Sequence, residues 1–243
     1  MPSPLLRAHA HNDYSHTRPL LDALDQGFCS VEADIYLENG KLLVGHDKKD
    51  LRPERTLTAL YLEPLWQRVR ANRGQVYPEA APVTLLVDIK ADGPRVYAAL
   101  KEVLAPFVPM LTRFEGGKIQ RRAITVILSG DRPRAVLAPE RSRLAALDGR
   151  PEDLAGDAPL SLIPLISESW LTLFRWWGTG LMSHADREKL ADLIGRAHDQ
   201  GREIRFWAAP DTPLGWDIQW RAGVDRINTD HLPELATFLR KQL

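Results

Sequence analysis

The chain has one cysteine, no long apolar run and no net charge. Its single cysteine, Cys29, excludes an intramolecular disulfide, and the apolar run around it favours a small buried side chain over a reactive thiol. No apolar run approaches the roughly 18 residues of a membrane-spanning helix, so we expect no transmembrane segment. The 32 Lys and Arg residues balance the 32 Asp and Glu residues. The sequence therefore lacks the basic field that nucleic-acid binding normally requires, and we expect no nucleic-acid partner.

A secretion signal is also missing from the first residues. Met1-Pro2-Ser3-Pro4 leads directly into residues 5–9, with no charged segment followed by an apolar core. The chain as written is therefore expected in the cytoplasm. A secreted protein whose signal peptide had been removed would show the same sequence. The oligomeric state stays open.

The composition is that of a globular enzyme. Of the 243 residues, 44% are hydrophobic and 26% are charged, which is enough to bury a core and to keep a polar surface. Residues 1–243 are expected to form one domain, because α/β barrels of roughly 200 to 250 residues commonly do so.

Apolar runs of strand length alternate with longer helical segments, a pattern typical of repeated βα units around a parallel sheet. The strand candidates are 5–11, 30–37, 83–90, 124–128, 143–147, 160–166, 204–208 and 224–228. The helix candidates include 18–26, 57–70, 94–107, 185–200 and 233–243. This order predicts a single TIM-type (β/α)8 barrel, with a doubly wound open sheet as the alternative. The strand at 143–147 has the weakest pattern.

Charged side chains stand in or at the end of the first three predicted strands. Alternation along a strand places His9 with His11, and Glu32 with Asp34, on one face of their strands. Asp88 follows the apolar stretch of the third strand. In a barrel these strand ends form the mouth where active sites lie. Three carboxylates converging there need a cation, and an oxygen-only ligand set favours Mg²⁺ or Ca²⁺ over Zn²⁺.

Each signal alone has a plainer interpretation. A Glu-x-Asp pair in a strand is more often part of a structural ion-pair network. His46 lies in a turn-rich stretch after a predicted hairpin at Asn39-Gly40, where a histidine is usually a surface residue. Only the order and context of all these residues together favour an active site.

That order resembles the PLC-like phosphodiesterase superfamily, which includes glycerophosphodiester phosphodiesterases, sphingomyelinases D and phosphatidylinositol-specific phospholipases C. The shared pattern is a histidine after the first strand, Glu-x-Asp in the second, a hairpin leading to His-Asp, and an acidic residue two before a lysine in the third. The branch named after altered inheritance of mitochondria protein 6 is the most similar. The similarity rests on 11–14, 18–20, 30–34 and 43–46, with a weaker similarity to sphingomyelinase D at 204–207, 222–225 and 227–230.

The resemblance implies a divalent-metal-dependent phosphodiesterase. It implies that one cation, Mg²⁺ or Ca²⁺, is held by the carboxylates of Glu32, Asp34 and Asp88. It also implies that His11 and His46 form an acid/base pair. His9 is the alternative to His11 as the first histidine of this pair. We favour His11, because His11 lies nearer the strand end and beside Asn12.

The expected partner is a small phosphodiester, phospholipid-derived or glycerophosphodiester-like. Residues expected to contact it are His9, Asn12, Lys90 and Trp207, with Lys90 on the phosphate by resemblance. Glycerophosphodiesterases usually have Arg-Gly after the first histidine, where this chain has Asn12-Asp13. The identity of the diester is therefore open.

Two other functions fit the same fold. A catalytically idle barrel could bind a phosphorylated ligand, and a metal-dependent aldolase or isomerase could use the same scaffold. Retention of both histidines and all three carboxylates favours the phosphodiesterase.

Residues 170–178, after the sixth predicted strand, hold three of the chain's seven tryptophans. Their spacing predicts an amphipathic helix that packs its aromatic side chains on the barrel. The alternative is an apolar ledge for the lipid part of a substrate.

Overall fold

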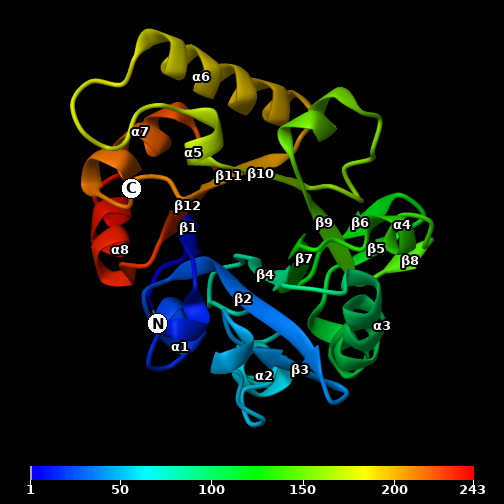
Figure 1. Ribbon diagram of the computed structural model, residues 1–243. Coiled ribbons are helices and arrows are strands. Elements are labelled where there is room, and N and C mark those ends of the chain that lie inside the picture. The colour runs from blue at the N-terminus through cyan, green and yellow to red at the C-terminus, as the bar shows by residue number, and fades with distance from the viewer. Residues whose placement is uncertain (1) are drawn as a thin grey trace.

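The computed structural model describes residues 2–243. Parallel strands close into a barrel in the order β1-β2-β4-β7-β9-β10-β11-β12, and β12 pairs again with β1 (Figure 1). The barrel strands are β1 (Leu5–Ala10), β2 (Phe28–Glu38), β4 (Val83–Ile89), β7 (Ile124–Gly130), β9 (Ala145–Gly149), β10 (Leu165–Ser169), β11 (Glu203–Trp207) and β12 (Arg226–Thr229). The predicted TIM-type barrel is confirmed, and the open sheet is wrong.

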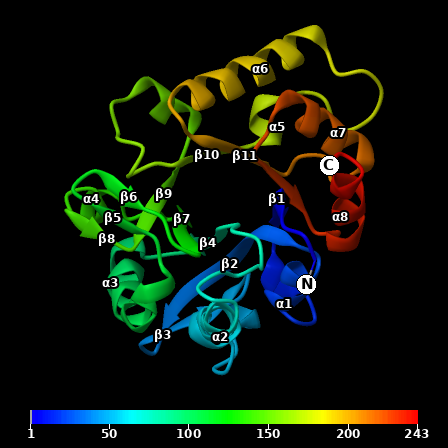
Figure 2. The same ribbon diagram turned by 180° about the vertical axis from the view of Figure 1, so that it is seen from behind.

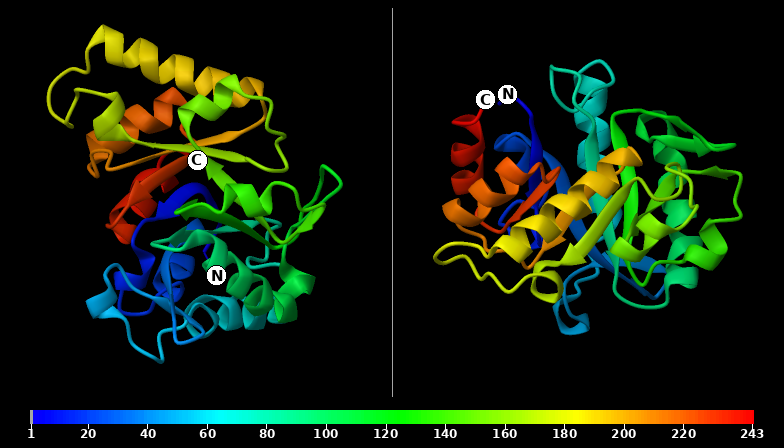
Figure 3. Two further views of the ribbon diagram at one scale, coloured as in Figure 1. Left: turned by 45° about the vertical axis from the view of Figure 1, so that its right-hand side comes forward. Right: turned by 90° about the horizontal axis from the view of Figure 1, so that it is seen from above.

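Helices surround this barrel on the outside (Figures 1 and 2). They are α1 (Leu21–Asp25), α2 (Glu63–Ala71), α3 (Gly93–Leu104), α4 (Arg134–Leu137), α5 (Trp170–Leu173), α6 (His184–Asp199), α7 (Pro213–Ala222) and α8 (Leu232–Arg240). Capping explains two of these ends, because Ser183 and Thr212 accept hydrogen bonds from the first turns of α6 and α7. α8 packs against β1, so the last helix closes the ring beside the first strand (Figure 3).

The region predicted least well is 138–166. The strand expected at 143–147 is displaced, because residues 142–143 form β8 (Ser142–Arg143) in a separate sheet with β5 (Arg113–Glu115) and β6 (Lys118–Gln120). The strand expected to begin at residue 160 begins at Leu165, directly after Pro164, which has no N–H to contribute to a ladder. The small sheet was not predicted.

The predicted hairpin is confirmed. β2 pairs antiparallel with β3 (Lys41–Val44), and Glu38 faces Lys41 across the turn. Asn39 (φ 50°) and Gly40 (φ 76°) both adopt positive φ, which the tight two-residue turns of hairpins require. The hairpin therefore sends the chain back toward the end of β2 and places His46 there.

The inside of the barrel is unusually polar. TIM barrels are normally filled by large branched apolar residues. Here a small buried cluster of Leu86, Ile127 and Leu165 is separate from the main apolar core. Towards the carboxyl ends of the strands, the side chains that alternate with outward apolar residues are polar or charged, among them Glu32 and Arg205. The barrel thus carries its charged site in its own interior.

The tryptophan-rich segment is helical only over 170–173, so the amphipathic helix predicted for 170–178 is wrong beyond that turn, and the apolar ledge stays a prediction. α5 is only one turn long, and Trp170 is fully buried with its ring 5.7 Å from that of Phe206. Trp176 is 6% exposed, whereas Trp177 is 67% exposed. Core packing therefore describes Trp170 and Trp176, and Trp177 projects to the surface.

None of the helices in residues 2–243 is long and apolar enough to span a membrane.

Replacing Trp176 with alanine is expected to lower the free energy of unfolding by about 3 to 5 kcal/mol, as truncation of a buried large aromatic side chain does. The loss includes the hydrogen bond from its Nε1 to the Gly180 carbonyl, 3.1 Å. Trp177→Ala is the matched control and should change stability by no more than about 0.5 kcal/mol. Denaturant unfolding measures both, and equal losses would contradict this difference in burial.

Candidate active site

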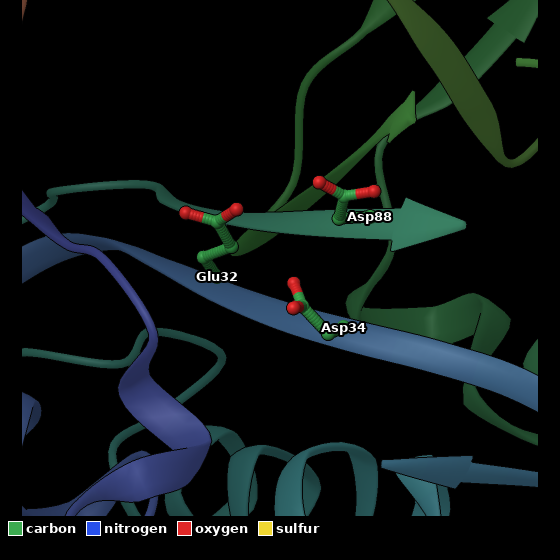
Figure 4. Close-up of side chains that lie close together, drawn as sticks. All are labelled: Glu32, Asp34 and Asp88. Atoms are coloured by element: carbon green, nitrogen blue, oxygen red, sulfur yellow. The ribbon is translucent and has the colours of Figure 1, made fainter. Parts of the chain in front are cut away.

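Three carboxylates meet where β2 and β4 lie side by side (Figure 4). Glu32 and Asp34 alternate on the inner face of β2, and Asp34 is the direct register partner of Asp88 on β4. One oxygen of each side chain lies within 4.8 Å of the others. The structure therefore brings together the three residues that the sequence predicted as cation ligands.

Each carboxylate has an oxygen left over for a ligand. The contacts of Glu32 both use Oε2, which is 3.0 Å from Arg205 Nη2 and 3.3 Å from His9 Nε2. Asp34 uses Oδ2 for the Lys90 ammonium at 2.7 Å. Its other oxygen, Oδ1, is buried without a hydrogen-bond partner among the described residues. A buried carboxylate oxygen without a partner is costly, so this donor set fits a hard divalent cation.

The local charges act on the carboxylates in different directions. Burial opposes ionisation of Glu32, but the positive charge of Arg205 and the hydrogen bond from His9 hold the pKa of Glu32 well below its usual range. For Asp88, burial raises the pKa to about 6; the negative charges of Asp34 and Glu32 add to this effect and Lys90 opposes it. The cluster thus gathers more negative charge than its neighbours balance.

A glycine makes room for Asp88. Gly130 ends β7 beside β4 with φ of +69°, a conformation that favours glycine. A Cβ atom at this position would overlap Asp88 Oδ1 and the carbonyl oxygen of Ile89. The Asp88 carboxylate can therefore occupy its position only because residue 130 is a glycine without a side chain.

Both histidines predicted as an acid/base pair lie beside this cluster. His46 Nδ1 is 3.1 Å from Asp34 Oδ2, and its side chain is 63% exposed. His11 Nδ1 is 2.9 Å from Asp230 Oδ1. Burial alone would lower the pKa of His11, but its hydrogen bond to the Asp230 carboxylate and the charges of Glu32 and Asp230 raise this pKa. Each imidazole is thus oriented through Nδ1 by a carboxylate.

Asn12 and Tyr14 connect the two histidines. Asn12 has left-handed backbone angles (φ 48°, ψ 34°), which asparagine tolerates better than most residues. Its amide lies between His11 Nδ1 (2.9 Å from Nδ2) and the Tyr14 hydroxyl (2.6 Å from Oδ1). That hydroxyl is also 2.7 Å from Asp34 Oδ2 and 3.2 Å from His46 Nδ1. Burial and the charge of Asp34 raise the Tyr14 pKa, so the hydroxyl stays a donor.

His9 occupies a different position from His11. It is 1% exposed, with Nδ1 2.7 Å from Ser30 Oγ and Nε2 directed at Glu32. Burial and the charge of Arg205 lower its pKa to about 3. His9 therefore stays neutral near pH 7 and supports Glu32 from behind, and it is absent from the residues lining the cavity, which does not fit the expected contact with substrate.

The cavity above the cluster has a volume of about 310 Å³. Of the predicted residues it is lined by His11, Asn12, Glu32, His46, Asp88, Lys90 and Trp207. Sequence analysis missed the roles of Tyr14 and Asp230, and of Arg150 and Arg205 in the lining. Arg205 had a usable signal: like Asp88, it is a charged residue inside an otherwise apolar strand.

A barrel with a carboxylate cluster and two histidines at its mouth is what the resemblance to the PLC-like phosphodiesterase superfamily led us to expect. In agreement, residues 3–146 match the AIM6-like phosphodiesterase domain, and residues 203–233 match the glycerophosphoryl diester phosphodiesterase family. The first match spans more than half of the chain. The chain belongs to the AIM6-like phosphodiesterase family.

Individual relatives agree. Altered inheritance of mitochondria protein 6 from Eremothecium gossypii is 30% identical, over 96% of this chain and 69% of its own length. A homolog from Arthroderma benhamiae is 27% identical, over 91% of this chain and 80% of its own. Two glycerophosphodiester phosphodiesterase structures share the fold. The structure from Parabacteroides distasonis has a TM-score of 0.57 and 12% identity, over 99% of both chains. The structure from Agrobacterium tumefaciens has a TM-score of 0.54 and 13% identity, over 98% of this chain and 100% of that one.

Gly130→Ala is expected to displace the Asp88 carboxylate and weaken binding of a divalent cation. Gly117→Ala is the matched control: its φ is +82° and it has no atom within 4 Å of an added Cβ. Both variants should lose about 1 kcal/mol or more of stability from the left-handed backbone. Only Gly130→Ala should lose affinity in calorimetric titrations with Mg²⁺ and Ca²⁺; equal affinities in both variants would contradict the steric argument.

Asp230→Asn is expected to lower the pKa of His11, because it removes the Asp230 charge and its hydrogen bond, which raise this pKa together with Glu32, and leaves burial, which lowers it. NMR titration of the His11 imidazole measures the change. Asp225→Asn is the control, since Asp225 pairs with His198 at 2.8 Å. A His11 titration that does not move in Asp230→Asn would show that the contact does not govern its protonation.

Proposed function

We propose that the protein is a divalent-metal-dependent phosphoric diester hydrolase that uses His11 and His46 as an acid/base pair. The observation that carries the proposal is the buried Asp34 Oδ1, which lacks a hydrogen-bond partner among the described residues and lies in a cluster with Glu32 and Asp88. Membership in a phosphodiesterase family gives that cluster its chemical context.

Glu32, Asp34 and Asp88 would hold one Mg²⁺ or Ca²⁺, because both ions prefer carboxylate oxygens. When bound, such a cation neutralises the anionic oxygens of a diester and orients the phosphorus for attack, which lowers the barrier by several kcal/mol. Glu32 is already held by Arg205 and His9, so its free oxygen needs little reorganisation to serve as a ligand.

Lys90 is placed to contact the phosphate. Its ammonium lies 2.7 Å from Asp34 and 3.5 Å from Asp88 and is 21% exposed in the cavity. With a cation bound by Asp34 and Asp88, the Lys90 ammonium would be held less strongly by these carboxylates and would be available to pair with a diester oxygen. Asn12 and Trp207 line the same cavity and would complete the contacts with substrate.

The two histidines would move protons through Nε2. Their Nδ1 atoms are engaged by Asp230 and Asp34, so Nε2 is the nitrogen left for the reacting groups. One imidazole takes the proton of the nucleophile while the other gives a proton to the leaving oxygen, each transfer being worth roughly 10²- to 10⁴-fold. The nucleophile is water or a neighbouring hydroxyl of the substrate, and the product is then a phosphomonoester or a cyclic phosphate.

The substrate class is a phospholipid-derived or glycerophosphodiester-like molecule. The exposed Trp177 follows β10, whose carboxyl end lies at the barrel mouth, and it would give an acyl chain an apolar surface to contact. A turnover screen with Mg²⁺ should therefore include short glycerophosphodiesters, lysophospholipids, sphingomyelin and phosphoinositides.

The metal part of the proposal predicts one site per chain in calorimetric titration of the EDTA-treated protein. Asp34→Asn should bind Mg²⁺ and Ca²⁺ at least tenfold more weakly, because an amide replaces a charged ligand. Asp157→Asn, an exposed carboxylate outside the cluster, should bind as the parent does. Parent-like affinity in Asp34→Asn would remove the assignment, and metal binding without turnover of any diester would favour an idle barrel.

His11 and His46 should act as a unit. Alanine at either position is expected to lower kcat by roughly 10²- to 10⁴-fold, and the double variant should lose little more, since both residues serve one transition state. His184→Ala, an exposed helix residue, is the control. Parent-like turnover by His46→Ala would refute the pair, and loss in His9→Ala but not in His11→Ala would transfer the role to His9.

A further inference from the structure

A second charged group lines the cavity on the side away from the carboxylate cluster. Arg150 follows β9 and Trp207 ends β11, and in the ring of strands each of these is separated from β2 by two others (Figure 1). The Arg150 guanidinium lies over the Trp207 ring, 4.8 Å from its centre. The chemistry proposed above does not use this guanidinium.

Arg150 is held in one orientation. Its Nη1 donates to Asp148 Oδ2 (3.0 Å) and to the Gly149 carbonyl (2.8 Å), and its backbone N–H donates to Asp153 Oδ2 (2.9 Å). Both side-chain bonds use Nη1, so Nε and Nη2 have no hydrogen-bond partner within residues 2–243. The side chain is 16% exposed and lines the cavity. A fixed guanidinium with free donors is suited to a carboxylate or a phosphate.

A second guanidinium group lies near Arg150. The fully buried Asp148 also accepts from the hydroxyls of Ser167 (2.6 Å) and Ser129 (2.8 Å), so its oxygens are already used. A second arginine, Arg132, donates to the Asp148 carbonyl at 2.7 Å. Burial, and then the charge of Arg150, lower the pKa of Arg132. Two guanidinium groups thus lie beside Asp148, but only that of Arg150 pairs with its carboxylate.

The same contacts disfavour a cationic headgroup. A quaternary ammonium is usually bound over aromatic rings, but Arg150 already covers a face of Trp207. A second cation there would also meet the charges of Arg150 and Arg132, while the buried carboxylates of Asp148 and Asp153 are already paired with Arg150 and Arg134. This side of the cavity therefore selects against choline-like groups.

We infer that Arg150, stacked on Trp207, forms a subsite for an anionic substituent of the substrate, a carboxylate or phosphate a few carbons from the diester phosphorus. The inference rests on the proposed phosphodiesterase function and specifies its substrate class. β4 and β9 are two strand spacings apart, about 10 Å. Arg150 makes no hydrogen bond or ion pair with Glu32, Asp34 or Asp88 and is held by Asp148 and Gly149 instead, so we assign it to the next group along the substrate and not to the reacting phosphate.

The test is a matched series of 4-nitrophenyl phosphodiesters whose second alcohol is glycerol, glycerate, glycerol phosphate or choline. With the parent protein and Mg²⁺, kcat/KM should be about 10- to 100-fold higher for the glycerate or glycerol phosphate diester than for the glycerol diester, the range expected for one charged hydrogen-bonded contact. The choline diester should be the slowest. The two anionic probes show whether a carboxylate or a phosphate is preferred.

Arg150→Gln should lower kcat/KM for the anionic diesters about 10- to 100-fold more than for the glycerol diester. Arg132→Gln is the matched control, because it removes the same charge from a residue that does not line the cavity, and it should leave most of the preference for the anionic diesters over the glycerol diester in place. Since Arg150→Gln leaves Asp148 buried without its cation, Asp148→Asn/Arg150→Gln provides a neutral pair if the single variant does not fold.

Calorimetric binding measurements test the anion subsite independently of turnover. The parent should bind 3-phosphoglycerate more tightly than glycerol 3-phosphate, and Arg150→Gln should lose that difference. Turnover without preference for the anionic diesters, or an equal loss on all diesters in Arg150→Gln, would overturn the subsite and leave the hydrolase proposal standing. No turnover of any diester, with the calorimetric preference retained by the parent and lost in the variant, would overturn the hydrolase proposal and uphold the anion subsite.

Discussion

The buried contact between Glu32 and Arg205 is the constraint on which the site depends. The two side chains are 6% and 3% exposed and come from strands on different sides of the barrel. Arg205 is further fixed by Asn228 at 2.9 Å, and Glu32 by His9. A buried charge without its partner is strongly destabilising, so these groups stabilise one another only as a set. The carboxylate cluster is therefore held in place by the protein itself before any ligand arrives.

This set is possible because the barrel separates two kinds of packing. Outward side chains of the strands form the apolar core with the surrounding helices, so the fold does not rely on an apolar barrel interior. Inward positions near the strand ends are left for charged groups, which are neutralised pairwise: Glu32 with Arg205, Asp34 with Lys90, Asp148 with Arg150. Acidic and basic groups therefore face one cavity, which is lined by Glu32, Asp88, Lys90, Arg150 and Arg205.

The sequence predicted what depends on local alternation. The period of two along β2 and the apolar run before Asp88 were enough to bring three carboxylates together, and the Asn39-Gly40 turn was enough to place His46. The partners from distant strands could not be read in the same way. Arg205 is 173 residues from Glu32, and Asp230 is 219 residues from His11, so their pairing follows from closure of the barrel. The β8 strand and its small sheet depend on similarly non-local pairing, within a region rich in Pro and Gly.

The β2–β3 hairpin has a consequence for how this protein can vary. One continuous segment, from Glu32 to His46, carries two of the carboxylates and one histidine, and it folds back so that the Gly45 N–H donates to the Asp34 carbonyl at 3.1 Å. A one-residue slip in a β ladder turns every side chain to the opposite face. Insertions in the two-residue turn would therefore rotate His46 away from Asp34. The length of this short turn sets the register of β3 on β2 and with it the position of His46. Among the loops of the barrel, its length should therefore be among the least tolerant of change during divergence.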